Sequence, residues 1–117
     1  MNALPYFGIF LNTEMSIVLK ALADPTRRRI LELLRTRPMT AGEIAAHFTV
    51  AKPTLSGHFA VLREADLVEA DKRGTTITYR LKLSVLEEAI AGLAELFKVG
   101  LLKPATRRKR WTPARLR

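Results

Sequence analysis

Few side chains in this chain of 117 residues could take part in chemistry, and those few lack suitable partners. There are no cysteines and only two histidines, His47 and His58. A chain without cysteine cannot form disulfides, sense redox state through a thiol or hold a metal on thiolates. Glu87 and Glu88 are adjacent on a predicted helix and point in different directions, which argues against paired-carboxylate catalysis. We therefore expect no enzyme, no cofactor and no metal site.

The polar side chains are better arranged for binding than for catalysis. Between Lys52 and Ala65, Leu55, Phe59 and Leu62 recur at helical spacing and should face the core. The candidate contact residues are small, polar or basic and comprise Lys52, Pro53, Thr54, Ser56, Gly57, His58 and Arg63. A helix face without bulky side chains can enter the DNA major groove, where Ser contacts a phosphate or a base edge. For His58, either a phosphate contact or a bond to a neighbouring backbone group fits.

Two further elements flank this helix. Thr40 and Glu43 form a capping-box pattern that opens a short helix continuing through Phe48, with a turn at 49–51.

A hairpin follows at 67–81, in which apolar and polar residues alternate and Arg73-Gly74 marks the turn. Lys72 and Arg73 at its tip could enter the minor groove or contact phosphates. This order predicts a winged helix-turn-helix, mainly α with a small β-hairpin.

Three more helices complete the prediction. One spans 16–23, and a second spans 25–35, where Asp24 can cap the helix and Pro25 fits its first turn. The second helix carries a basic run at 27–29, which either approaches the DNA backbone or faces solvent. The last helix begins at Ser84 with a capping-box pattern to Glu87 and carries a wide apolar face.

The net charge of +9 is unevenly distributed along the chain. Residues 103–117 contain seven Lys or Arg and no acidic residue, whereas the rest of the chain has thirteen basic and eleven acidic residues. We expect a basic tail at 101–117 that is disordered from residue 103 onward and that either binds phosphates flanking the site or is only a solvated, disordered segment. Residues 1–15 are predicted to form an N-terminal arm, and 16–100 the DNA-binding and dimerisation domain. Met15 could serve as an alternative start.

No segment approaches the length of a membrane-spanning helix. The apolar stretch at 4–11 is interrupted by Pro5 and Gly8 and lacks a preceding positive region, so it is a poor signal peptide. The sequence therefore predicts a cytoplasmic protein without membrane insertion.

With these residues in view, the chain resembles the ArsR family of bacterial winged-helix repressors. The matching segments lie at 19–27 (LKALADPTR), 30–34 (ILELL), 54–65 (TLSGHFAVLREA) and 79–81 (YRL). The SdpR-like subgroup is closer still, because of the segments at 39–48 (MTAGEIAAHF), 52–54 (KPT) and 84–88 (SVLEE). The resemblance covers roughly residues 16–97.

The resemblance implies a homodimer that binds an inverted-repeat operator and represses transcription, often of its own operon. In the family the first and last helices form the dimer interface, which here assigns Ile17, Val18, Leu86, Ile90, Leu93 and Phe97 to it. Metal-sensing members carry Cys pairs in the third helix or His and carboxylate ligands in the last. Because this chain has neither Cys nor His there, metal sensing is not carried over.

Two positions depart from the family pattern. Ala51 stands where the family usually has a capping Ser, a loss that costs about 1 kcal/mol. Gly57 stands where a larger residue is common, which weakens the helix and changes its groove-facing surface.

We thus expect a sequence-specific repressor that is released by an unidentified partner protein or small ligand, for which the aromatic arm at 4–11 could be a docking surface. The competing interpretation is a winged-helix module for protein interactions, whose tail binds polyanions without sequence preference.

Overall fold

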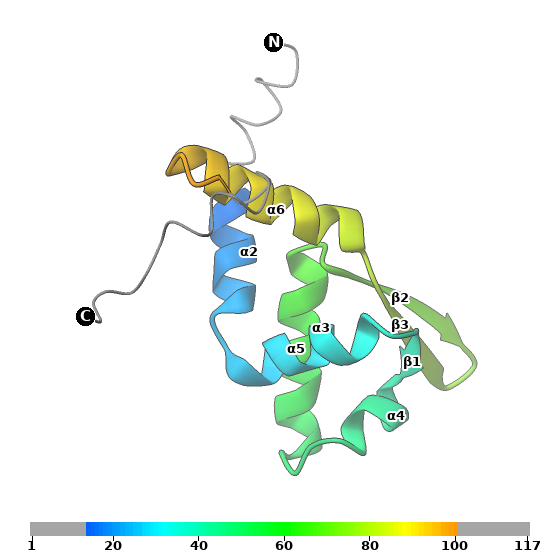
Figure 1. Cartoon of the computed structure of the whole chain (residues 1–117). Helices are drawn as coiled ribbons and strands as arrows, with labels where there is room; N and C mark the ends of the chain where they lie inside the picture. Colours follow the sequence, from blue (N-terminus) through cyan, green and yellow to red (C-terminus); the bar gives the residue numbers. More distant parts are fainter. Residues whose placement is uncertain (1–13, 101–117) are drawn as a thin grey trace.

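The computed structural model describes residues 14–100, so residues 1–13 of the expected arm and the whole of the expected basic tail lie outside them. The helices are α2 (Met15–Leu22), α3 (Pro25–Leu34), α4 (Ala41–Ala45), α5 (Lys52–Glu64) and α6 (Leu83–Leu96), and the strands are β1 (Met39–Thr40), β2 (Val68–Arg73) and β3 (Thr76–Leu81). The strands form an antiparallel sheet in the order β1-β3-β2. In Figure 1, α6 and α2 lie at one end of the molecule, α4 at the other, and the β2–β3 hairpin extends to one side. The predicted winged-helix architecture is confirmed.

The helix starts follow local sequence signals. Asp24 caps α3 by accepting hydrogen bonds from the backbone N–H groups of Thr26 (2.8 Å) and Arg27 (3.1 Å). The capping box of α4 is present in both directions, with Glu43 N–H to Thr40 Oγ1 at 3.1 Å and Thr40 N–H to Glu43 Oε1 at 2.9 Å. Both predicted caps are confirmed, and they fix where α3 and α4 begin.

The core is built around α5. Leu55, Phe59 and Leu62 are all buried, as their spacing predicts. They pack with fully buried residues of the neighbouring elements, among them Val18, Ile30, Ile44 and Leu67. Because one side of α5 is held in this core, its other side is presented to solvent in a fixed orientation.

The structure differs from the sequence-based prediction in four details of its helices and strands. The sequence did not predict β1, which forms by pairing Met39 with Tyr79 and Thr40 with Thr78. Helix α4 ends at Ala45 rather than continuing through Phe48. Helix α6 starts at Leu83, its N-cap is Lys82, and no side chain caps it, so the predicted Ser84–Glu87 capping box is wrong. Helix α2 begins at Met15, which is buried in the core.

The hairpin turn is made by the two residues Gly74 and Thr75, and Gly74 has a φ of 63°, a conformation that glycine adopts without strain. Within residues 14–100 no helix is long and apolar enough to cross a bilayer.

Candidate nucleic-acid interface

The outward face of α5 carries most of the predicted contact residues. These exposed residues are Lys52, Pro53, Thr54, Ser56, Gly57 and Arg63. The N-cap of α5, Ala51, makes no side-chain hydrogen bond, so the first-turn backbone donors have no capping side chain. A helix face of this composition can approach a nucleic acid closely, and its open N-terminus favours a phosphate.

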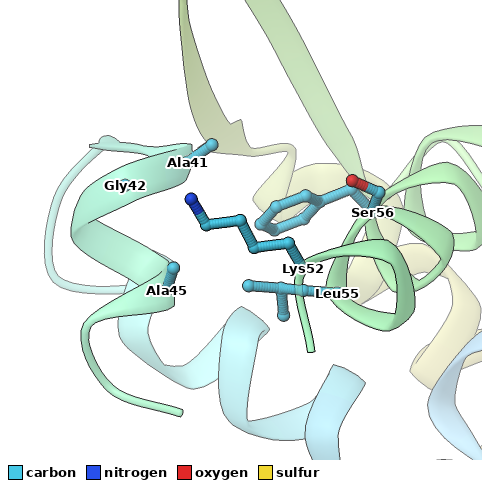
Figure 2. Close-up of a pocket in the computed structure, with 7 residues that line it drawn as sticks. Ala41, Gly42, Ala45, Lys52, Leu55 and Ser56 are labelled. Atoms are coloured by element: carbon cyan, nitrogen blue, oxygen red, sulfur yellow. The ribbon is translucent and has the colours of Figure 1, made fainter. Parts of the chain in front are cut away.

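A hollow of about 190 Å³ separates α4 from α5 next to this face. Its lining is mostly apolar and consists of Ala41, Gly42, Ala45, Lys52, Leu55, Ser56 and Phe59. Figure 2 shows the Lys52 side chain extending from α5 across this space toward Ala41 on α4, with Ser56 one turn further along α5. The hollow therefore belongs to the same surface as the exposed α5 residues, and it has room for a small apolar group flanked by an ammonium and a hydroxyl group.

His58 occupies a different position from the other predicted contact residues. Its side chain is only 15% exposed and points toward the junction of α2 and α3. Nδ1 lies 3.1 Å from Nη1 of Arg27, and Nε2 lies 3.8 Å from Oδ2 of Asp24. Both polar partners of the His58 ring are side chains, those of Arg27 and Asp24. The hydrogen bond to a backbone group that the sequence also allowed is therefore not found among the described residues.

Arg27 links three elements, a role that the sequence did not reveal. Its Nε donates to the carbonyl oxygen of Ala21 at 2.8 Å, and Nη2 donates to that of Lys20 at 2.9 Å, at the C-terminal end of α2. Its Nη1 faces His58 on α5. No local signal distinguishes Arg27 from Arg28 and Arg29, because its partners come from α2 and α5.

The Asp24 carboxyl completes this junction. Partial desolvation raises its pKa, but the backbone hydrogen bonds from Arg27 and Thr26 and the nearby His58 and Arg27 side chains outweigh that effect. Because the net result is a pKa below the usual value, Asp24 is ionised near neutral pH and can both cap α3 and face the ring of His58.

The hairpin places two more predicted contact residues at its tip. Lys72 and Arg73 are both exposed, and Arg73 Nε lies 3.3 Å from Oδ2 of Asp71. The Arg73 side chain is 81% exposed, so this surface ion pair holds it weakly and leaves it accessible to a polyanion.

The predicted dimer residues divide into two groups. Val18 is buried in the core of the single chain, and Ile17, Leu86 and Leu93 are partly buried. Ile90 and Phe97 remain 43% and 67% exposed. Further exposed apolar residues lie on or next to α2 and α6, namely Leu19, Leu83, Leu96 and Val99. We call Leu19, Leu83, Ile90, Leu96, Phe97 and Val99 the apolar end face.

Together, the winged helix-turn-helix fold and the open face of α5 define a DNA-binding transcription regulator. Residues 24–70 match the family model described as bacterial regulatory protein, arsR family. The chain is 41% identical over 86 residues to the transcriptional repressor SdpR of Bacillus subtilis, covering 74% of this chain and 96% of that protein. It is 36% identical over 80 residues to an arsenical resistance operon repressor of Staphylococcus aureus, covering 68% and 77%. The chain therefore belongs to the ArsR family.

Solved structures agree with this assignment. A crystal structure of an ArsR family transcriptional regulator, RHA00566, superposes with a TM-score of 0.68 at 30% identity, covering 74% of this chain and 94% of that one. A possible transcriptional regulator for arsenical resistance gives a TM-score of 0.62 at 35% identity, covering 72% and 90%. These relatives and solved structures are all named as transcriptional regulators or repressors.

Proposed function

We propose that this protein is a homodimeric repressor that binds an inverted-repeat operator, with α5 in the major groove and the β2–β3 hairpin beside it. The observation that carries the proposal is the exposed face of α5, whose side chains are small, polar or basic and whose N-terminus lacks a capping side chain. The relatives that are named repressors support the direction of the regulation.

The contacts divide by their chemistry. Lys52 and the open first turn of α5 suit phosphate, while Thr54 and Ser56 suit phosphate or base edges. Gly57 offers no side chain, so the backbone can come close to the DNA. Lys72 and Arg73 at the hairpin tip add contacts to phosphates or the minor groove. Affinity is expected to depend mainly on the phosphate contacts, and specificity on the side chains in the groove.

Dimerisation is supported by the apolar end face. Its residues lie on or beside α2 and α6, at the end of the molecule opposite α4 (Figure 1). A two-fold dimer contact at this end of the molecule buries the same apolar patch of both subunits. It also presents two copies of α5 to successive major grooves, roughly 34 Å apart. Each α5 then meets one half of an inverted repeat.

The regulatory signal is proposed not to be a thiol-bound metal, because the chain contains no cysteine. Among residues 14–100, no group of three or more His, Cys, Asp or Glu side chains is placed to hold a metal ion. Control of its own operon is proposed from the family resemblance and from relatives named as operon repressors.

The test is fluorescence anisotropy with DNA from upstream of the protein's own gene, beside a scrambled duplex of equal length at physiological salt. A preference on the order of a thousandfold or more supports a specific repressor with a local operator. A variant lacking residues 103–117 serves as the control: a repressor keeps its sequence preference while losing affinity. Weak binding that ignores sequence and disappears with the tail favours the protein-interaction module instead.

A further inference from the structure

The ring of His58 is held between two charged groups of opposite sign. Arg27 Nη1 lies 3.1 Å from Nδ1, and Asp24 Oδ2 lies 3.8 Å from Nε2. Both groups belong to the start of α3. Helix α2 faces Arg27 with the carbonyl oxygens of Lys20 and Ala21, and among residues 14–100 no side chain of α2 makes a polar contact with the ring.

The Arg27 contact determines which nitrogen of the ring acts as the acceptor. A guanidinium group has donors and no acceptor, so Nδ1 must accept the hydrogen bond and cannot carry a proton. The proton of the neutral ring is then on Nε2, which faces the ionised Asp24. The arrangement therefore fits one species, the neutral Nε2–H tautomer.

Protonation at Nδ1 disrupts this arrangement. The ring nitrogen becomes a donor and loses the hydrogen bond from Arg27, while two positive charges come to lie side by side. Arg27 cannot withdraw freely, because its Nε and Nη2 also hold the C-terminal carbonyls of α2. The charged ring is still attracted to Asp24 but is repelled by Arg27, so the link that Arg27 makes between α5 and the C-terminal end of α2 is lost.

We infer that His58 is a positioning residue that holds α5 against the α2–α3 junction in its neutral form, so that protonation of the ring weakens DNA binding. The inference rests on the proposed function for its effect on DNA. It departs from a direct role of His58 at a phosphate, and the two roles predict opposite pH dependences. A histidine at a phosphate binds DNA more tightly once protonated, whereas a positioning histidine binds it less tightly.

The experiment compares the wild-type protein with His58→Gln and with His47→Gln as the matched control. Glutamine at position 58 can accept from Arg27 and donate to Asp24 but does not titrate. His47 is the only other histidine and is exposed. The probe is a duplex that the wild-type protein selects from a random-sequence library. Affinity is measured at constant ionic strength at about pH 7.5 and about pH 5.5, the range in which histidine titrates.

We expect the wild-type and His47→Gln affinities to fall on the order of tenfold between the two pH values, as for loss of one charge-assisted hydrogen bond. The His58→Gln ratio should stay near one. Wild-type affinity that rises on acidification, or a His58→Gln ratio equal to that of wild type, overturns the inference.

A second measurement needs no DNA. The ¹⁵N chemical shifts of the His58 ring at about pH 7.5 distinguish the two neutral tautomers, and we expect Nε2–H. If the library yields no preferred sequence, the proposed function fails, whereas the inference on positioning is still decided by the tautomer. A proton on Nδ1 at that pH overturns it.

Discussion

Phe59 of α5 stacks on Tyr79 of β3, with ring centroids 4.3 Å apart and ring planes inclined by 22°. Both side chains are buried. Tyr79 lies in the central strand of the sheet, paired with Met39 of β1 and Ala70 of β2. The stacked rings therefore join α5 to the hairpin and help to fix the angle between them.

Replacing Tyr79 by Ala should destabilise the protein by about 3 kcal/mol, because a large buried ring is removed and the space cannot fully collapse. Tyr79→Phe is the control, since it keeps the stacking ring and should cost much less. Urea unfolding measures both. Equal losses for the two variants would show that the hydroxyl group matters and the stack does not.

Restoring a capping side chain at position 51 should stabilise the protein. The backbone of Ala51 is extended (φ −65°, ψ 149°), as an N-cap requires, but its side chain cannot accept a hydrogen bond. Ala51→Ser should add about 1 kcal/mol to the free energy of unfolding. Ala60→Ser, at an exposed position within α5, is the control and should give no gain. The idea fails if both substitutions have the same effect in urea unfolding.

Much of this fold could be predicted because its signals are local. The caps at Asp24 and Thr40 depend on residues two or three positions away, and the buried stripe of α5 depends on spacing alone. Local signals also explain why the exposed surface of α5 could be predicted, since it is the complement of that stripe.

The missed features depend on contacts between distant parts of the chain. Strand β1 is only two residues long and exists because Met39 meets Tyr79. The orientation of His58 depends on Arg27, 31 residues earlier. The Ser84 pattern did match a local rule, but α6 begins one residue before it, and so Ser84 lies inside the helix.

Acid should remove the contribution of Glu43 to stability. A hydrogen bond from the Thr40 backbone lowers the pKa of the Glu43 carboxyl, and Arg37 assists, while desolvation opposes them. A carboxyl group whose pKa is lower in the folded than in the unfolded state stabilises the fold in its ionised form. This contribution is complete at pH values above the unfolded-state pKa, and it is lost as the pH falls through the folded-state pKa. Glu43→Gln should therefore cost stability at neutral pH and less at about pH 3, which lies below the ordinary Glu pKa of about 4.3.

Urea unfolding at the two pH values measures this difference, with Glu64→Gln at the exposed end of α5 as the control. A penalty for Glu43→Gln that is unchanged at the acidic pH would mean that the charge of Glu43 is irrelevant to the cap.

Ile90→Glu should break the proposed dimer. Ile90 is 43% exposed in the single chain, so a charge there costs the monomer little, but it would be buried in a two-fold contact across the apolar end face. Light scattering after gel filtration should give a dimer mass for the wild type and a monomer mass for the variant. Ser84→Glu, at an exposed polar position on α6, should remain a dimer. A variant that stays dimeric places the interface elsewhere.

Lys52→Ala should weaken binding to the operator and to a scrambled duplex by a similar factor, because a phosphate contact carries no sequence information. The slope of the logarithm of affinity against the logarithm of salt concentration should fall in magnitude by about 1, as for one lost phosphate contact. Lys98→Ala, two residues after the end of α6, is the control and should leave the slope unchanged. A loss confined to the operator would instead mean that Lys52 reads a base.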